Sequence, residues 1–386
     1  MLDTDFDFVI ITNKFTWGLE ILQQIAGVEK RTAGDKGEKK LVNVSHLLKR
    51  LRVLLLYDLD PSWTPAERGE VLDAQERLTA RLAAEGYRIE MLPVVDRFFA
   101  ERILGVNPET CLFFNWCEGI PGIRHSEWMV ARALEEKGFV FTGSGSETLA
   151  LSYQKHRVKQ LLAAEGIPTP PWRLFDRPPA AGEWERFPAI VKPAVGHCSD
   201  WVTSDSVVMD TAELRERVET LLVGAGIPAL VEEFIDGREF HVSLWGNGTI
   251  RMLPPAEMDF AALDDIRERL CTYDAKFTPG SPAYEAIRTL LPAPLADDER
   301  DTLERFCRAA YRAVGCRDYG RLDVRLRDGV FYVLDVNPNP DISEDASMAS
   351  AAEVEGLSHA AMAETLIRLA GHRHPALAGC PAQAGH

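Results

Sequence analysis

Near the C-terminus the sequence carries two carboxylates and an amide at a spacing that suits a divalent cation. Two β-rich runs within residues 319–336 flank an Asp-Gly pair, which is a strong signal for a tight hairpin turn. Because side chains alternate along a strand, Asp323 shares a face with Arg321, and Asp335 shares a face with Asn337. Pairing the strands brings these four side chains together, and three oxygen ligands with water suit Mg²⁺. The alternative is a half-buried hairpin whose charges only face solvent.

A lysine at the end of an apolar strand offers a charge for a phosphate group. Lys192 ends the predicted strand Ala189–Lys192 and precedes a short loop that holds one glycine. Loop amides can donate to phosphate oxygens, and the lysine can neutralise their charge. Taken alone, this segment fits a solvated strand end better.

Further along the chain, an acidic strand turns through a glycine into another strand. Glu232 and Glu233 precede the turn at Gly237, and Glu239 follows it. Carboxylates and backbone groups at such a turn can read an adenine amino group and ribose hydroxyls. An acidic hairpin mouth without a ligand explains the same residues.

Size and composition predict a globular protein of two or three domains. The chain has 386 residues, of which 46% are hydrophobic and 26% are charged. No apolar run approaches the roughly 20 residues that cross a bilayer, and the first residues lack the basic start of a secretory signal. The net charge of −16 argues against a nucleic-acid partner. Seven cysteines without a Cys-x-x-Cys motif favour reduced thiols over a disulfide framework or a zinc site. We therefore expect a cytoplasmic protein without a membrane or nucleic-acid partner, and the sequence leaves a homodimer open.

The first half of the chain alternates strand-like and helix-like segments, which predicts an open, mostly parallel α/β sheet. Glycines close both predicted helices, as expected at helix ends. The stretch before this sheet is an N-terminal extension without an assigned role. The predicted strands are 53–57, 88–93, 110–115 and 139–142, and the predicted helices are 67–85 and 126–137.

The second half predicts a small unit and then a larger one. A polar segment over 257–296 shows no sustained period, and loops of this length are often substrate lids. A single helix over 351–370 ends the fold, and the tail after Gly371 is expected to fray. The remaining predicted helices are 154–165, 211–222 and 297–314, and the remaining predicted strands are 189–192, 229–233, 238–245 and 249–254.

In this order and spacing the segments resemble the ATP-grasp superfamily, and within it the D-alanine–D-alanine ligase family. The resemblance covers about residues 52–370. Each motif is modest alone, but their common order is highly specific. The segments that carry it are 115–119, 141–144, 154–159, 191–193, 231–235, 237–240, 275–277, 315–323 and 335–340.

The resemblance implies an ATP-dependent ligase that joins a carboxylate to an amine through an acyl phosphate, with release of ADP and phosphate. It implies ATP and two Mg²⁺ ions, with Mn²⁺ as an alternative, and small-molecule carboxylate and amine substrates such as amino acids. Carried over by position, Lys155, Lys192, Ser199 and Lys276 contact the ATP phosphates. Residues Glu232, Glu233, Phe234 and Ile235 line the adenine pocket, Glu239 lies near the ribose, Asp323, Asp335 and Asn337 bind the metal ions, Arg321 and Lys276 are catalytic, and Glu67 contacts the first substrate.

The ATP-side positions are filled, whereas several substrate-side positions depart from the family pattern. No glycine precedes Glu67, so this residue fits a helix N-terminal acid equally well. Phe277 replaces a tyrosine, and Asp341 replaces a glycine whose amide contributes to an oxyanion hole. The serine expected for the second substrate's carboxylate falls at Ala346. Further departures are Asp335 in place of glutamate and His197, Cys198, Asp200 and Trp201 in the phosphate loop.

The fold class that follows is α/β with an ATP-grasp fold. An N-terminal open parallel α/β sheet precedes a small central α+β lid unit and a C-terminal α+β domain with the metal site. We interpret the chain as a specialised amino-acid or dipeptide ligase. The alternatives are an ordinary D-alanine–D-alanine ligase and an ATP-binding subunit without turnover. The predicted domains are 1–50, 51–145, 146–235, 236–371 and a tail at 372–386.

Overall fold

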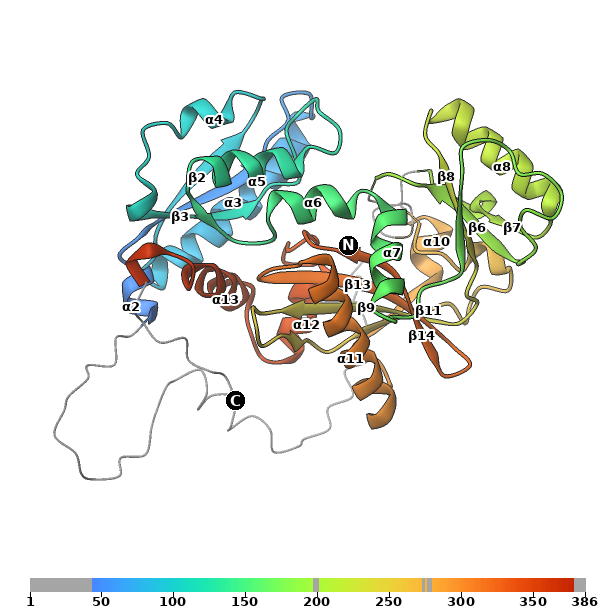
Figure 1. Ribbon diagram of the computed structural model, residues 1–386. Coiled ribbons are helices and arrows are strands. Elements are labelled where there is room, and N and C mark those ends of the chain that lie inside the picture. Colours follow the sequence, from blue (N-terminus) through green and yellow to red (C-terminus); the bar gives the residue numbers. More distant parts are fainter. Residues whose placement is uncertain (1–43, 197–200, 273–274, 276–279, 378–386) are drawn as a thin grey trace, which may run out of the picture. The chain divides into compact units, whose positions relative to one another are not determined.

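The computed structural model describes residues 44–196, 201–272, 275 and 280–377 (Figure 1). This part of the chain contains two four-stranded sheets and one six-stranded sheet. No helix within it is long and apolar enough to cross a membrane. Each sheet with its covering helices is described in turn.

The N-terminal sheet is parallel throughout and has the strand order β2-β1-β3-β4, as the alternating pattern predicted. Its central strand β1 is buried continuously from Val53 to Tyr57, which is typical of a parallel strand covered on both faces. Helix α3 begins at Pro65 because Thr64 and Glu67 form a capping box. The elements are α2 (Val44–Leu48), β1 (Arg52–Asp58), α3 (Pro65–Ala84), β2 (Arg88–Val94), α4 (Phe99–Arg102), η1 (Pro108–Thr110), β3 (Cys111–Trp116), α5 (Glu127–Glu136) and β4 (Val140–Phe141).

The central sheet is antiparallel, with the order β5-β8-β6-β7. Helix α8 packs its apolar side on this sheet, and Asp210 caps its N-terminus. The sequence pattern did not reveal the short strands β5 and β7 or the helix α6. The elements are α6 (Ser146–Ser152), α7 (Lys155–Ala164), β5 (Trp172–Phe175), β6 (Ala189–Pro193), η2 (Ser204–Ser206), β7 (Val207–Val208), α8 (Thr211–Gly224) and β8 (Ala229–Glu233).

The six-stranded sheet has one apolar face and one polar face. Its order is β12-β11-β9-β13-β14, with β10 paired to β9. Helices α7 and α11 cover the apolar face, where Phe240, Leu322 and Val336 join one core (Figure 1). Its elements are β9 (Arg238–Trp245), β10 (Arg251–Met252), β11 (Ala256–Asp259), η3 (Ile266–Glu268), α10 (Pro282–Ala286), β12 (Arg288–Leu290), α11 (Asp297–Val314), β13 (Tyr319–Arg327) and β14 (Val330–Asn337); the chain ends through α12 (Ser347–Val354), α13 (His359–Gly371) and η4 (Pro375–Leu377).

The structure corrects three predictions for the second half of the chain. The segment 257–296, expected to be a long loop, supplies most of strand β11 and the edge strand β12. The single helix expected over 351–370 is two helices, because Gly356 has a φ of 80° and Ser358 caps a new helix. The tail does not fray directly after the last helix: the side chain of His374 is only 1% exposed and contacts two backbone carbonyls of the N-terminal sheet region.

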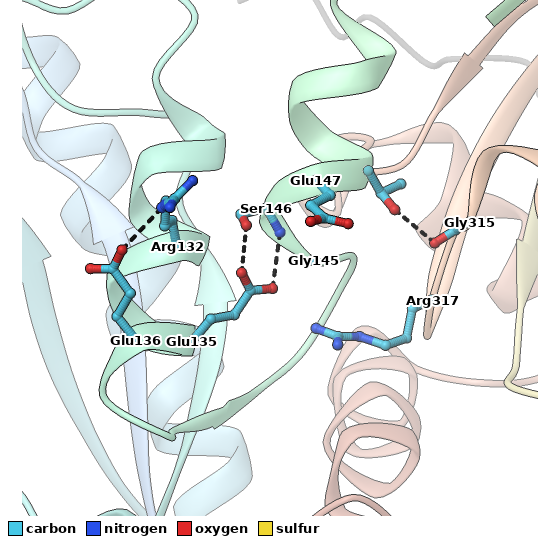
Figure 2. Close-up of a pocket in the computed structure, with 9 residues that line it drawn as sticks. Arg132, Glu135, Glu136, Gly145, Ser146, Glu147, Gly315 and Arg317 are labelled. Carbon is cyan, nitrogen blue, oxygen red and sulfur yellow. Dashed lines mark hydrogen bonds and ion pairs between the residues drawn. The ribbon is translucent and has the colours of Figure 1, made fainter.

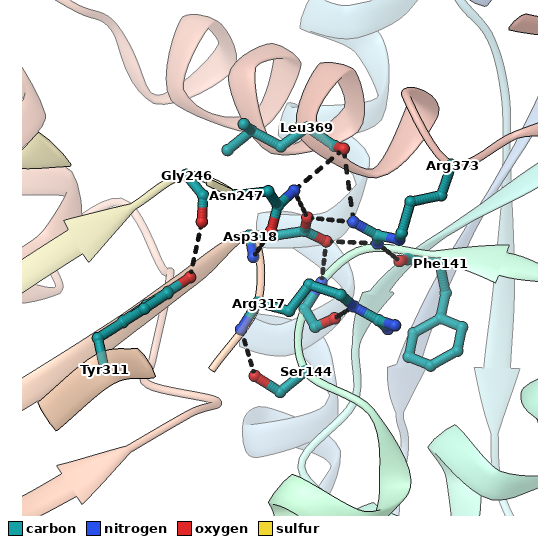
Figure 3. A network of polar contacts seen from close by, with 10 residues as sticks. Phe141, Ser144, Gly246, Asn247, Tyr311, Arg317, Asp318, Leu369 and Arg373 are labelled. Atoms are coloured by element: carbon teal, nitrogen blue, oxygen red, sulfur yellow. Dashed lines mark hydrogen bonds and ion pairs between the residues drawn. The ribbon is translucent and has the colours of Figure 1, made fainter. Parts of the chain in front are cut away.

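A buried aspartate ties the C-terminal sheet to the N-terminal sheet (Figure 3). Asp318 has no exposed surface and accepts hydrogen bonds from the Gly143 amide at 2.8 Å and from Asn247 Nδ2 at 2.7 Å. Arg373 donates to both carboxylate oxygens at 2.5 and 2.7 Å, and it also donates to the Phe141 carbonyl. A carboxylate that is fully hydrogen-bonded in this way can stay ionised inside the protein.

Removing this carboxylate is expected to destabilise the whole fold. Asp318→Ala leaves the Arg373 guanidinium and two further donors without their acceptor, which should lower the free energy of unfolding by about 3–5 kcal/mol. Urea denaturation measures the change. The control is Arg52→Ala, which breaks the exposed ion pair with Glu90 and should cost about 0–1 kcal/mol. Equal losses in the two variants would contradict the role given to Asp318.

Candidate active site

The polar face of the six-stranded sheet gathers the charged residues that the sequence singled out. Strand alternation sends the apolar side chains of β9, β13 and β14 toward α7 and α11, so the intervening charged side chains lie on the opposite face. The charged side chains on this face are buried or only partly exposed, so they need polar partners in the protein. The face carries Glu239 and His241 from β9, Arg321, Asp323 and Arg325 from β13, and Asp335 and Asn337 from β14.

The hairpin register places the predicted metal ligands directly opposite one another. Asp323 pairs with Asp335, and Arg321 pairs with Asn337. A β-bulge at Leu334 lies next to these pairs, since Val324 pairs with Val333. Two carboxylates and an amide oxygen on one surface are a donor set that fits Mg²⁺ or Mn²⁺.

Two cations already balance these carboxylates. Arg321 Nε donates to Asp323 Oδ1 at 2.8 Å, and Lys155 Nζ lies 3.3 Å from Asp335 Oδ2. Burial opposes the charge on Arg321, but Asp323 more than offsets it and raises the pKa of the guanidinium. Lys155 Nζ also donates to the Gly196 carbonyl at the start of the phosphate loop. The arrangement therefore joins the predicted phosphate loop to the predicted metal ligands through one lysine.

A buried glutamate holds two lysines on the central sheet. Glu232 is 1% exposed; its Oε1 lies 2.8 Å from Lys192 Nζ, and its Oε2 lies 3.0 Å from Lys159 Nζ. Burial lowers the pKa of Lys159 to about 8, although Glu232 opposes the shift. Burial acts the same way on Lys192, but Glu232 and Asp335 outweigh it and raise the pKa of that lysine. Lys192 therefore stays charged, as a phosphate ligand must.

The two glutamates of the predicted adenine strand point to different partners. Glu232 faces the lysines, whereas Glu233 Oε1 lies 2.6 Å from Arg327 Nη2. Phe234 and Ile235 are buried, with 3% and 2% of their surfaces exposed. The adenine role proposed for these four residues thus rests on two side chains in the core and on the strand's backbone.

Glu239 forms a buried ion pair beside the metal-ligand set. Burial alone would raise its pKa, but Arg325 and His241 hold the pKa well below its ordinary value. Arg325 Nε donates to Glu239 Oε2 at 2.7 Å, and Arg325 also donates to the Ile235 carbonyl at 2.8 Å. The atoms with which Glu239, His241 and Cys271 could bind a metal ion lie within 4.8 Å of one another. The predicted ribose contact is therefore one member of a packed polar cluster.

Two predicted residues lie outside the described part of the chain, and one has another role. Lys276 and Ser199 are not among the described residues. Glu67 is exposed, and its Oε2 accepts hydrogen bonds from the Thr64 amide at 2.7 Å and the Thr64 hydroxyl at 2.8 Å. The structure gives Glu67 a capping function, and its contact with substrate stays a prediction.

A second group of carboxylates lies where the N-terminal sheet approaches the segment after β14. Asp58 ends β1, and its Oδ1 accepts from the Glu118 amide at 3.1 Å. Glu118 has exposed surface, but the protein around it still desolvates its carboxylate; this desolvation, followed by the charges of Asp58 and Asp341, raises the pKa of Glu118 to about 7. Burial also raises the pKa of Glu127 to about 7, despite a hydrogen bond from Asn339 and with a further rise from the charge of Glu118. We call Asp58, Glu118, Glu127 and Asp341 the acidic cluster.

A surface pocket of about 510 Å³ lies between α5, α6 and the segment before β13 (Figure 2). Its charged side chains pair with one another: Glu135 accepts from Ser146, and Arg132 pairs with Glu136 at 3.0 Å. None of the predicted site residues lines it. We therefore place the active site on the polar sheet face rather than in this pocket.

Comparison with known proteins identifies the family. A family model described as "D-ala D-ala ligase C-terminus" matches residues 161–368, more than half of the chain. The chain belongs to the D-alanine–D-alanine ligase family. It is an ATP-grasp carbon–nitrogen ligase, as the order of its motifs implied.

Individual relatives agree with this assignment. The ligase is 32% identical over 264 residues to an uncharacterized protein, y4sG, from Sinorhizobium fredii, a match that covers 68% of this chain and 75% of the relative. It is 28% identical over 315 residues to a D-alanine–D-alanine ligase from Desulforudis audaxviator, covering 80% of this chain and 96% of that one. In fold it is similar to the D-alanine–D-alanine ligase from Bacillus anthracis complexed with ATP, with a TM-score of 0.62, 18% identity, and coverage of 83% of this chain and 97% of that one.

The predicted set of site residues did not include three buried side chains of the candidate site. Lys159, Arg325 and His241 are 1%, 2% and 7% exposed, and each pairs with a predicted site residue. Alternation along the strands already placed Arg325 with Asp323 and His241 with Glu239, so this signal was available. Lys159 belongs to the segment 154–159 that carries the family resemblance, but its pairing with Glu232 could be seen only in the folded structure.

The pH dependence of stability should reveal the buried acid of the acidic cluster. Folding raises the Glu127 pKa from 4.5 to about 7, so the folded state favours the protonated form, and the charged form costs stability as pH rises through this range. Glu127→Gln removes that cost and should stabilise the ligase at pH 8 relative to pH 5, by up to about 3 kcal/mol. The groups facing Glu127 are Glu118, Asn339 and Tyr153.

Urea denaturation of the Gln variant at the two pH values provides the measurement. Glu109→Gln removes an exposed carboxylate just before the N-terminal end of β3, whereas Glu127 lies beyond its C-terminal end, and this variant serves as the control. The same stability change at pH 5 and pH 8 for Glu127→Gln would refute the raised pKa.

Proposed function

We propose that the protein is a specialised ATP-dependent ligase that joins a carboxylate to an amine other than D-alanine. The observation that carries the proposal is the contrast between two sets of carboxylates. Those on the polar sheet face, Asp323, Asp335 and Glu232, are balanced by lysines and an arginine. Those of the acidic cluster form no ion pair with a lysine, arginine or histidine in the described residues. The ATP half thus keeps the charge balance that phosphates require, whereas the other half disfavours a substrate carboxylate.

The ATP half has the groups that phosphoryl transfer needs. Lys155 and Lys192 would neutralise phosphate oxygens, and Asp323, Asp335 and Asn337 would hold Mg²⁺. The metal would supply positive charge to the phosphate oxygens when bound. Because catalysis of phosphoryl transfer depends mainly on positioning and charge, this set is sufficient in kind.

In the proposed reaction a substrate carboxylate oxygen attacks the γ-phosphorus of ATP, and ADP leaves. The amine then attacks the carbonyl carbon of the acyl phosphate, phosphate leaves, and the amine nitrogen loses a proton. Arg321 would stabilise the negative charge that develops on the transferred phosphoryl group and on the tetrahedral intermediate. The products are an amide, ADP and phosphate.

The segment after β14 supports a substrate other than D-alanine. Asp341 places a carboxylate there, where the family pattern has a glycine. Ala346 is the N-cap of α12 and makes no side-chain cap, so no hydroxyl from this position can meet a substrate carboxylate. An amine with a carboxylate close to its nitrogen would therefore lack a donor and face like charge.

An ordinary D-alanine–D-alanine ligase is the alternative. It is favoured by the relatives that carry that name and by Ser347, which lies directly beside Ala346. If the Ser347 hydroxyl binds the carboxylate of the second substrate, it takes the role of the serine that is missing at position 346.

Binding of Mg-ATP should depend on the base of the hairpin and not on its tip. A ligand at one hundred times its dissociation constant stabilises the folded state by about 2.7 kcal/mol, so Mg-ATP should raise the melting temperature of the wild type. Asp323→Asn removes a metal ligand and should lose most of that shift. Asp328→Asn makes the same chemical change at the exposed tip and should keep it. A wild-type protein that melts at the same temperature with and without millimolar Mg-ATP would rule out the proposed ATP site.

Turnover assays distinguish a ligase for another amine from an ordinary D-alanine–D-alanine ligase. Wild-type enzyme with Mg-ATP and D-alanine alone should release ADP slowly, whereas a screen of amino acids with other amines should find faster pairs. Arg321→Ala should lower turnover with any active pair by about 10²–10³, because a preorganised charge is lost. Arg300→Ala, on the exposed side of α11, is the matched control and should not change it. Rapid formation of D-alanyl-D-alanine would establish the ordinary ligase instead.

A further inference from the structure

The acidic cluster is built from three separate parts of the chain. Asp58 comes from the end of β1, Glu118 and Glu127 come from the segment around the start of α5, and Asp341 follows β14. The Glu118 amide donates to Asp58 Oδ1 at 3.1 Å, and the charges of Asp58 and Asp341 both act on the Glu118 carboxylate. The charges of Asp58 and Asp341 disfavour the ionised form of Glu118, so the ionised cluster costs folding free energy unless a cation joins it.

One oxygen of the cluster is buried without a hydrogen-bond partner. Glu127 is 6% exposed; its Oε2 accepts from Asn339 Nδ2 at 3.1 Å, and the Tyr153 side chain also faces the carboxylate and lowers its pKa, but no donor meets the buried Oε1 with hydrogen-bond geometry. Asn339 Nδ2 also donates to the Cys117 carbonyl at 3.3 Å, which places the Glu127 carboxylate beside the segment that carries Glu118. The Asn115 side-chain oxygen nearby in sequence is likewise buried and unpartnered. Buried acceptors without donors are costly, so these oxygens favour a donor supplied from outside.

The cluster lacks the cations that balance every other acid of the site. Within the described residues, no lysine, arginine or histidine forms an ion pair with Asp58, Glu118, Glu127 or Asp341. By contrast, Asp323, Asp335, Glu232 and Glu239 each pair with an arginine or a lysine. The cluster therefore presents uncompensated negative charge, together with buried acceptors, next to a balanced phosphate-binding region.

The chain connects this cluster to the predicted metal ligands over a short distance. Asn339 follows Asn337 by two residues, and its side chain bridges to Glu127 while it accepts a hydrogen bond from the Tyr319 hydroxyl at 2.9 Å. Its backbone amide donates to Asn337 Oδ1 at 3.1 Å. A substrate that reacts beside Asn337, which would hold the metal, can thus reach the acidic cluster with another part of its structure.

We propose that the acidic cluster binds a cationic group of a substrate, an ammonium or guanidinium beyond the amine that reacts and beyond the α-ammonium of an amino acid. This inference rests on the proposed ligase function and specifies its substrate class as basic. Glu118 and Asp341, which have exposed surface, attract the cation, while buried Glu127 accepts its hydrogen bonds. A bound cation also favours the ionised form of these carboxylates, so its binding should release protons near pH 7.

Two matched pairs of compounds test the proposal by binding and by turnover. Ornithine and norvaline differ in a terminal ammonium on an amino acid, and 1,4-diaminobutane and butylamine differ in the same group on a simple amine. Isothermal titration calorimetry in the presence of Mg-ADP measures binding, and ADP release with Mg-ATP measures turnover. We expect the charged member of at least one pair to bind ten times or more tightly than its neutral partner. The pair that shows the preference identifies which substrate carries the cation.

Variants show whether the preference belongs to the acidic cluster. Glu118→Gln and Asp341→Asn change exposed side chains and should fold, and each should abolish most of the preference. Glu109→Gln removes the same charge just before the N-terminal end of β3 and should keep the preference. Thermal melting verifies that all three variants are folded.

Three results would overturn the inference. The neutral compounds could bind as tightly as the charged ones, the preference could survive in Glu118→Gln, or Ca²⁺ and Mg²⁺ alone could bind at the cluster. Charged compounds that bind through Glu118 without ADP release from any pair would leave the cation site standing and reject the ligase function. ADP release without a charge preference would support the ligase function and reject the cation site.

Discussion

The six-stranded sheet has one face that must be buried under α7 and α11, and this requirement sorts all its side chains. Phe240, Val242 and Leu244 point to the helices, so Glu239 and His241 are forced to the other face. Because the sheet is wide and mostly buried, these charged groups cannot rely on water and have to be paired. The result is a surface of alternating acids and bases, which is what a phosphate-binding site needs before any ligand arrives.

The pairing crosses from one sheet to another. Two lysines of α7 make the crossing: Lys155 meets Asp335 of the C-terminal sheet, and Lys159 meets Glu232 of the central sheet. Lys192 meets the same Glu232 from the neighbouring strand of the central sheet. Thr169 strengthens the same junction, since its hydroxyl accepts from Lys159 and donates to the Val333 carbonyl. The charge balance of the candidate site is therefore a property of how the central and C-terminal sheets are held together.

Sequence reasoning recovered what short-range rules control. Alternation and the Asp-Gly turn were enough to predict the hairpin of β13 and β14, and strand–helix alternation was enough for the parallel sheet. The bulge at Leu334 was not predicted, and it is this bulge that places Asp335 rather than Leu334 opposite Asp323. It failed where tertiary packing decides. The segment 257–296 lacks a hydrophobic period because β11 and β12 are short strands: β11 pairs with β9, and β12 pairs only with β11. The Glu127 environment was also out of reach, since the helix pattern shows only an acid in a first turn and the donor Asn339 comes from far along the chain.

The bulge at Leu334 divides β14 into two parts with different side-chain registers. Toward the turn, Phe331 and Val333 follow the spacing of the core, whereas beyond the bulge Asp335 and Asn337 follow the spacing of the charged face. The extra residue absorbs the mismatch, so insertions or deletions toward the turn need not move the ligand end of the hairpin. The outer end of this hairpin can therefore change length without shifting the three residues from Asp335 to Asn337, which the bulge keeps in the register of the charged face.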